Sequence, residues 1–239
     1  MFEFTELDYQ ETPLGAISLR RRSEPRLGGK ALYEVKLGDE FLMSSLFVEA
    51  EEELAAFALQ SLNAEELDVV VGGLGLGYTA AKVLENETVR SVLVIETITS
   101  VISWHRLGLV PLGDKLALDS RCSLVHGDFF ELAASPGGFD ADNPGRLFHA
   151  VLLDIDHSPR HWLDTGNSAF YTGAGLTALA ALLHPGGVFG LWSNDPPDEA
   201  FSSLLNEVFA SAEFHLVTFP NPYTGGQSSN TIYLAYRAG

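Results

Sequence analysis

The stretch that decides the fold is Val69-Val70-Val71-Gly72-Gly73-Leu74-Gly75-Leu76-Gly77. Three valines followed by glycines indicate a buried strand that runs into a tight turn. Glycines at Gly73, Gly75 and Gly77 permit that turn and let a ligand approach the backbone closely. The dinucleotide fingerprint would need glycine in place of Tyr78, and the Gly-Lys-Ser/Thr of a phosphate loop is absent. The spacing therefore favours a nucleoside-type cofactor without a pyrophosphate, and a turn that serves packing alone is the alternative.

Strands and helices alternate on both sides of this turn, which predicts an α/β fold with a parallel sheet covered by helices on both faces. A closing antiparallel pair completes a Rossmann-like, seven-stranded, methyltransferase-type sheet. The expected strands are 68–71, 91–95, 123–125, 150–153, 188–192, 214–219 and 231–236. The expected helices are 51–62, 78–84, 97–105, 129–132, 171–183 and 200–209, and Glu51–Glu53 in the first turn of the first helix suit the helix dipole.

Residues 1–48 precede this pattern and are rich in β-strand signals. Positions 15–22 and 31–37 alternate between apolar and polar residues, and a Gly38-Asp39 turn leads into a third strand at 41–43. The sequence thus predicts an N-terminal β segment at 1–48 and a Rossmann-like domain at 49–239. Because a few short strands need a surface to pack on, we expect them to lean on the rest of the chain or on a second subunit, and we predict a homodimer.

Two acidic residues follow the next two strands. Glu96 ends the strand after the glycine turn, about 20 residues downstream, where a carboxylate can accept hydrogen bonds from ribose hydroxyls. Asp128 follows the third strand and can accept a hydrogen bond from an adenine amino group, with Phe129 or Phe130 as an apolar neighbour. A helix N-cap is the alternative for Asp128, and the two roles are compatible.

The fourth strand leads into Asp154-Ile155-Asp156-His157-Ser158-Pro159. Ligands of open α/β sheets bind outside the carboxyl ends of the strands, so we expect transfer chemistry here, with Asp154, Asp156 and His157 as the catalytic candidates. A carboxylate in this place can orient or deprotonate an amine, or hold a cationic substrate. His157 and His161 are four residues apart, but Pro159 disfavours a helix that would carry both, and we predict no metal site. His105, His126 and residues 192–195 are further candidates for lining the pocket.

Composition excludes several classes of protein. The 239 residues include 32 acidic and 14 basic side chains, a formal charge of −18, and show no basic face for a nucleic acid. The acidic balance tolerates a cationic substrate. A single cysteine, Cys122, excludes an internal disulfide and a cysteine-based zinc site. No secretory signal and no apolar run long enough for a membrane span are present, so we expect a soluble cytoplasmic protein.

These motifs resemble the spermidine synthase (polyamine aminopropyltransferase) family, within the class I S-adenosylmethionine-dependent methyltransferase fold. Residues 71–77 look like the family's Gly-Gly-Gly-Asp-Gly-Gly turn, and 94–96 like its ribose-binding strand end. Residues 125–128 look like its adenine-binding Gly-Asp, and Leu153-Asp154 like the start of its catalytic Asp-x-x-Asp-Pro loop. The resemblance implies S-adenosylmethionine or its decarboxylated form as cofactor, and a small-molecule acceptor such as a polyamine.

The departures from the family concern the amine half of the site. The acidic residue of the family's turn is Gly75 here, and the second aspartate of the catalytic loop is His157. The family's glutamine is lost from residues 43–48, and its Tyr-His-Glu stretch is not visible in 51–57. The preferred hypothesis is a spermidine synthase-like transferase with Asp154 as base or orienting group. The alternatives are an S-adenosylmethionine-dependent methyltransferase and a catalytically silent nucleoside-binding module.

Overall fold

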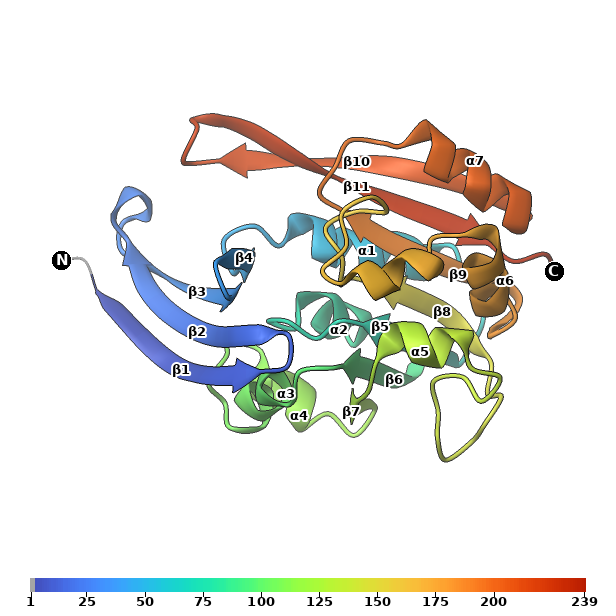
Figure 1. The fold of residues 1–239 in the computed structure, drawn as a ribbon, viewed down its shortest axis with the longest axis horizontal. Helices are drawn as coiled ribbons and strands as arrows, with labels where there is room; N and C mark the ends of the chain where they lie inside the picture. The colour runs from blue at the N-terminus through green and yellow to red at the C-terminus, as the bar shows by residue number, and fades with distance from the viewer. Residues whose placement is uncertain (1–2) are drawn as a thin grey trace.

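The computed structural model describes residues 3–239 and contains two β-sheets (Figure 1). The larger sheet has seven strands in the order β10-β11-β9-β8-β5-β6-β7, and its central pairs are parallel. The last two strands, β10 and β11, add antiparallel to β9. The predicted α/β class and methyltransferase-type sheet are therefore confirmed. The strands are β5 (Leu67–Gly72), β6 (Val89–Glu96), β7 (Cys122–His126), β8 (Phe148–Leu153), β9 (Leu183–Ser193), β10 (Ser211–Asn221) and β11 (Gly226–Tyr236).

Helices cover both faces of this sheet. Side chains alternate along a strand, so Val69 and Val71 of β5 face one apolar core and Val70 faces the other. The first core receives α1 (Glu49–Gln60), α2 (Tyr78–Val83), α3 (Thr99–Arg106) and α4 (Gly113–Ala117). The second receives α5 (Phe129–Ala134), α6 (Gly173–Ala180) and α7 (Glu199–Val208). Burial on both faces explains why the central strands read as unbroken apolar runs.

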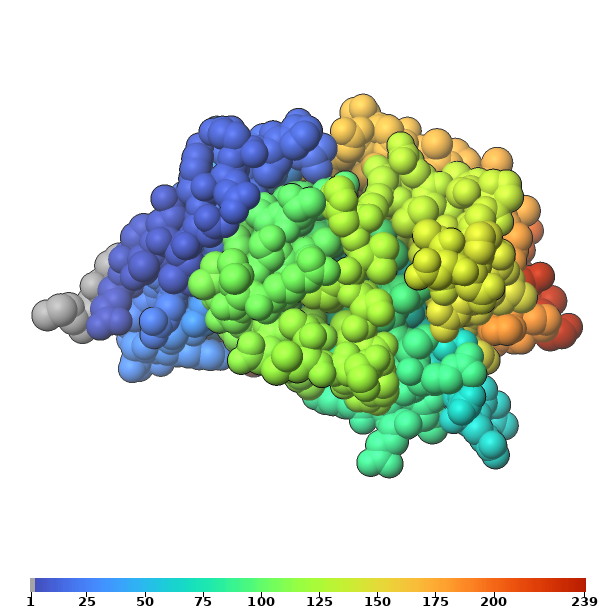
Figure 2. Space-filling view, turned by 90° about the horizontal axis from the view of Figure 1, so that it is seen from below, coloured from blue at the N-terminus to red at the C-terminus, as the bar shows by residue number. Residues whose placement is uncertain are grey.

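The smaller sheet is antiparallel and lies against α3 and α4 (Figure 2). Its strands are β1 (Phe4–Thr12), β2 (Gly15–Glu24), β3 (Lys30–Leu37) and β4 (Glu40–Ser44), with the short 3-10 helix η1 (Pro25–Leu27) between β2 and β3. Ile17, Leu19 and Val35 belong to the same apolar core as α1–α4. The indole Nε1 of Trp104 donates a 2.6 Å hydrogen bond to Asp8. The need of these strands for a packing surface is thus met within one chain, and the homodimer stays a prediction.

The β10–β11 hairpin extends well beyond the large sheet toward β2 and β3 (Figure 1). Tyr223, in its tip, joins the two sheets, because its hydroxyl accepts a 2.7 Å hydrogen bond from Arg22 and donates one of 3.1 Å to Glu24. Below this contact, the rings of Phe47 and Phe219 lie 5.4 Å apart. The sequence predicted a hairpin of 214–219 and 231–236, but both strands are longer and reach this contact.

One predicted helix was wrong in its extent. The helix expected over 171–183 is α6, which ends at Ala180, and Leu183 already pairs with Phe148 in the sheet. The His184–Gly187 stretch does not end a helix but bulges out of β9, because the register to β8 shifts there. Pro185 has no N–H for the ladder, and Gly186 has a φ of +76°. Four elements were not predicted: β1, η1, α4 and the 3-10 helix η2 (Thr165–Ala169).

None of the helices within residues 3–239 has the length and apolar character needed to cross a bilayer. The chain passes from the smaller sheet to the part that holds the larger sheet between Ser44, the last residue of β4, and Glu49, the first of α1. A division into 1–48 and 49–239 stays a proposal, since both parts contribute to one continuous apolar core.

Candidate active site

A cavity of about 1160 Å³ opens at the carboxyl ends of β5, β6 and β8. Strand β4, the start of α1 and the β10–β11 hairpin close it from the other side. This is the edge at which ligands of open α/β sheets bind. The cavity brings together seven of the eight predicted site residues: Gly73, Gly75, Gly77, Glu96, Asp128, Asp154 and His157.

The glycine turn depends on glycine at three positions. Gly73, Gly75 and Gly77 have φ values of +93°, +44° and +92°, a region that side chains with a Cβ rarely adopt. A Cβ at Gly73 would lie 2.1 Å from the carbonyl oxygen of Asp154. At Gly75 the same space is filled by the sulfur of Met43, which accepts a hydrogen bond from the Leu76 N–H at 3.1 Å. The side of the turn where the family carries a carboxylate therefore presents a thioether from β4.

His105 supports this turn from behind. It is fully buried in α3 and does not line the cavity, so our expectation of a pocket-lining role was wrong. Burial lowers the pKa of its imidazole, which favours the neutral ring. Its Nε2 lies 2.9 Å from the Gly75 carbonyl oxygen, which assigns the ring proton to Nε2 as donor. His105 thus fixes the backbone of the turn.

Glu96 lines the cavity at the end of β6. One carboxylate oxygen accepts the N–H of Leu74 at 3.1 Å, and the other accepts the N–H of Ile98 at 2.8 Å. These bonds hold the side chain beside the glycine turn. Desolvation raises the pKa of this carboxyl, and the backbone N–H groups oppose that rise. The carboxylate also lines the cavity, where the hydroxyls of a ribose can reach it.

Asp128 lines the cavity and also caps a helix. Its Oδ1 accepts the N–H groups of Phe130 and Glu131 at 2.8 and 3.1 Å, which fixes the start of α5. Within residues 3–239, Oδ2 accepts no hydrogen bond and stays available for an exocyclic amine. The half-buried ring of Phe130 lines the same wall. The fit of these groups to an adenosine is therefore good: two carboxylates that line the cavity, an apolar wall and a glycine turn without side chains.

Asp154 lies where β8 ends, directly against the turn. Its N–H donates to the Gly72 carbonyl at 2.8 Å, and its Oδ2 accepts the hydroxyl of Thr79 at 2.8 Å. Burial raises the pKa of this carboxyl to about 6, and the Thr79 hydrogen bond opposes the rise. A carboxyl with this pKa accepts a proton more readily than an exposed aspartate does, as a general base requires.

Glu51 is a cavity residue that the sequence analysis missed. It is 8% exposed and lines the cavity from the first turn of α1. Desolvation and the nearby charge of Asp154 raise the pKa of its carboxyl well above the usual value. Glu51 precedes Leu54, Ala55 and Ala58 by three, four and seven residues, the spacing of one helix face. That spacing could have revealed it, whereas we interpreted the acidic run of the first turn only as a partner of the helix dipole.

The other two catalytic candidates lie in different surroundings. Asp156 is 1% exposed and does not line the cavity. Its carboxylate accepts hydrogen bonds from the Leu163 N–H, the Asn167 amide and the Tyr171 hydroxyl, at 2.7 to 2.9 Å. Asp156 thus anchors the loop that follows β8, and its contacts support a positioning role.

His157 does line the cavity, at its rim. Its Nε2 lies 2.7 Å from a carboxylate oxygen of Glu40, at the start of β4. This contact joins the loop after β8 to the smaller sheet. His161 instead lies beside Asp195, at 2.8 Å. Residues 3–239 contain no group of three or more histidine, cysteine or acidic side chains that could hold a metal ion.

Only some of the other residues that we expected to line the cavity do so. Trp192 and Asn194 line the cavity, but Ser193, Asp195 and His126 do not. The His126 ring lies by the Thr97 carbonyl, at 3.1 Å, on the outer side of β7.

The charged side chains of the cavity wall, His157 apart, are all acidic. Six carboxyl groups contribute to it: Glu51, Glu96, Asp128, Glu131, Asp154 and Asp164. Among the described residues that line it there is no lysine and no arginine. An anionic ligand group would find backbone N–H groups here but no cationic side chain, whereas an ammonium or sulfonium group would be attracted.

Comparison with known proteins agrees with this geometry. A curated relative, polyamine aminopropyltransferase 2 of Pseudomonas aeruginosa, is 27% identical over 164 residues, which are 66% of this chain and 44% of that protein. A solved spermidine synthase, in complex with the transition-state analogue AdoDATO, superimposes with a TM-score of 0.74 at 19% identity, over 98% of this chain and 74% of that one. This chain has a spermidine synthase-like fold. No family model matches it.

Two further solved structures share the spermidine synthase-like fold. The spermidine synthase of Thermotoga maritima gives a TM-score of 0.72 at 18% identity, over 98% of this chain and 73% of that one. A probable spermidine synthase of Corynebacterium glutamicum gives 0.63 at 15% identity, over 96% and 79%. The match to the curated relative spans less than half of that protein's length, so its activity and substrates are matters for proposal here.

Proposed function

We propose that this chain transfers the aminopropyl group of decarboxylated S-adenosylmethionine to an amine acceptor. The observation that carries the proposal is the acidic cavity without lysine or arginine, next to a glycine turn and two carboxylates that suit an adenosine. The sulfonium and ammonium groups of such a donor are cations, and an amine acceptor is a cation until it loses a proton. The names of the related proteins agree with this chemistry.

The donor's nucleoside end lies between the glycine turn, Glu96 and Asp128 in this proposal. Glu96 accepts the ribose hydroxyls, and Oδ2 of Asp128 accepts the adenine amino group. The sulfur then lies near Gly73 and Asp154, because the carboxyl end of β8 lies directly against the turn.

Asp154 orients the acceptor amine and removes its proton. The neutral nitrogen attacks the aminopropyl carbon bonded to sulfur, so a C–N bond forms as the C–S bond breaks. The electron pair of the C–S bond stays on sulfur, which leaves methylthioadenosine. The proton lost from nitrogen goes to the Asp154 carboxylate, whose raised pKa suits this role.

The proposal is tested by incubating the protein with decarboxylated S-adenosylmethionine and single amines, putrescine first. We expect release of methylthioadenosine and an acceptor heavier by one aminopropyl group, both measured by mass spectrometry. Failure to bind methylthioadenosine or the donor in calorimetry, together with absence of product from any amine, would refute the proposal.

Methyl transfer from S-adenosylmethionine is the second candidate. It is favoured by Gly75, where the family's acidic residue is missing and the Met43 sulfur fills the space. Release of S-adenosylhomocysteine from S-adenosylmethionine, with no aminopropyl product from the decarboxylated donor, would decide for it.

A further inference from the structure

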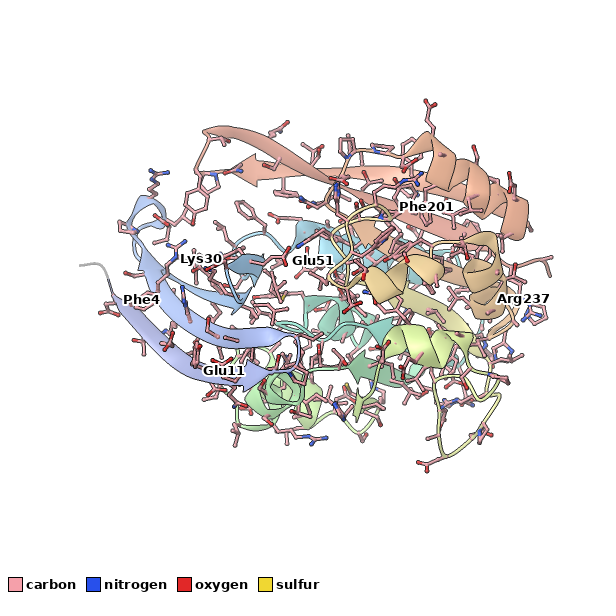
Figure 3. All side chains as sticks on the ribbon, viewed as in Figure 1. Phe4, Glu11, Lys30, Glu51, Phe201 and Arg237 are labelled. Carbon is pink, nitrogen blue, oxygen red and sulfur yellow. The ribbon has the colours of Figure 1, made fainter. Side chains whose placement is uncertain are left out.

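Glu51 is a buried acid with no basic partner. Its neighbours on α1, Glu52 and Glu53, are half-buried, but Glu51 turns toward the cavity and is 8% exposed. Within residues 3–239, no lysine or arginine forms an ion pair with it. Figure 3 shows Glu51 near the middle of the molecule, between the smaller sheet and the β10–β11 hairpin. Burying an acid without a cation is costly, and a ligand that brings a cation removes that cost.

The position of Glu51 relative to the glycine turn follows from its neighbours. The charges of Glu51 and Asp154 interact, and Glu51 also affects Tyr78, the first residue after the turn. Asp154 in turn contacts Gly73 through its carbonyl oxygen. Glu51 and Asp154 therefore lie close together in the cavity wall beside the glycine turn.

In the proposed function, the non-nucleoside part of the donor lies in this region, beside Gly73 and Asp154. The turn itself supplies no acid there, because position 75 is glycine and Met43 packs against it. Carboxyl groups reach this place from α1 and from the end of β8 instead. The tail of S-adenosylmethionine carries an ammonium and a carboxylate, whereas the tail of the decarboxylated donor carries the ammonium alone.

We propose that Glu51, acting with Asp154, is the residue by which this site distinguishes the two donors: it attracts the ammonium of the decarboxylated form and repels the carboxylate of S-adenosylmethionine. The inference rests on the proposed function and adds to it a specificity-determining residue that the glycine turn lacks. Two carboxyl groups that share a buried site hold a proton between them. Binding of an ammonium favours the fully ionised pair, so that proton is released.

The groups that face Glu51 set the pH dependence of this selection. They are Asp154 at the end of β8, Tyr78 from α2, and Glu49 and Glu52 from its own helix; His157, paired with Glu40, lies at the rim of the same cavity. The carboxyl groups and the phenol among them are neutral when protonated and negative when ionised. Preference for the decarboxylated donor is therefore expected to rise with pH as the carboxyl pair loses its proton.

The experiment compares three ligands by calorimetry: methylthioadenosine, decarboxylated S-adenosylmethionine and S-adenosylmethionine. Methylthioadenosine has neither ammonium nor carboxylate, so it reports the nucleoside site alone. The variants are Glu51→Gln, its matched control Glu53→Gln on the same helix, and the conservative Glu51→Asp. Each titration is run in two buffers of different ionisation enthalpy, which gives the number of protons released.

We expect wild type and Glu53→Gln to prefer the decarboxylated donor and to release protons on binding it. Glu51→Gln should reduce that preference about tenfold or more, a difference of about 1.4 kcal/mol, and should reduce the proton release. The Kd for methylthioadenosine should stay the same in all variants, which also shows that they are folded. Glu51→Asp should restore part of the preference.

An unchanged preference in Glu51→Gln, with methylthioadenosine still bound, would overturn this inference and leave the proposed function standing. A wild-type protein that does not bind methylthioadenosine would refute the proposed function, and this inference with it.

Discussion

The hydroxyl of Thr79, a buried residue of α2 just after the glycine turn, donates a 2.8 Å hydrogen bond to Oδ2 of Asp154 in the cavity wall. This bond lowers the pKa of a carboxyl that burial raises to about 6. As a base, Asp154 must be ionised, so activity should fall as pH drops through about 6. Thr79→Val removes the opposing hydrogen bond and should raise that pKa.

The acid limb of the kcat/KM profile should therefore move to higher pH in Thr79→Val, by about one unit, since a hydrogen bond to a charged group contributes about 1.5 kcal/mol or more. Thr79→Ser keeps the hydroxyl and should keep the wild-type profile. A profile that is the same in Thr79→Val and wild type would exclude Asp154 as the titrating base.

Asp154→Asn tests the base directly. The amide keeps the size of the side chain but cannot accept the proton of an acceptor amine. We expect kcat to fall about 10²- to 10⁴-fold, the usual contribution of a general base. The Kd for methylthioadenosine should change little, because the nucleoside contacts lie at Glu96 and Asp128. Full activity in this variant would contradict the proposed role.

Gly73→Ala should be strongly destabilising and should abolish nucleoside binding. The alanine would have to adopt a φ of +93° and would place its Cβ 2.1 Å from the Asp154 carbonyl oxygen. Gly186→Ala is the matched control, because Gly186 also has positive φ, +76°, but has open space around it. The control should lose only about 1–2 kcal/mol in a urea titration. Equal losses in the two variants would show that the close approach of Gly73 to Asp154 does not affect the free energy of unfolding.

Asp156→Ala should lower the stability of the protein by about 2–4 kcal/mol, because it leaves the buried donors of Asn167 and Tyr171 without an acceptor. Asp142→Ala removes an exposed carboxylate and should cost little. Urea unfolding at neutral pH measures both. If Asp156→Ala were as stable as Asp142→Ala and yet inactive, Asp156 would act on substrate and not as an anchor of the loop.

The sequence predicted the residues around the glycine turn that line the cavity, because their positions follow from local patterns. The glycine turn, Glu96 and Asp128 each follow a strand directly, and the carboxyl ends of parallel strands meet at one edge. The walls facing the reacting groups depend on contacts between distant segments. Met43 meets Gly75 across 32 residues, and Tyr223 meets Arg22 across 201. No local pattern encodes such pairs.

The same distinction explains why the sequence did not separate Asp156 from Asp154 and why Glu51 was missed. A carboxylate after a strand can turn into the cavity, as Asp154 does, or into the protein, as Asp156 does, and only its packing decides between them. Glu51 carried a usable signal in its helical spacing, but an acid within a run of acids resembles a solvated helix start.

The Met43–Gly75 contact has a consequence for how this scaffold can diversify. The nucleotide-binding core and the wall facing the transferred group are encoded by separate stretches of chain, the first in β5–β8 and the second mainly in β4 and the start of α1. Mutations within about ten residues around Met43 and Glu51 can change which group is delivered while the adenosine site keeps its shape. Under the proposed function, donor selectivity is thus encoded separately from the adenosine site and can change without changes in the glycine turn.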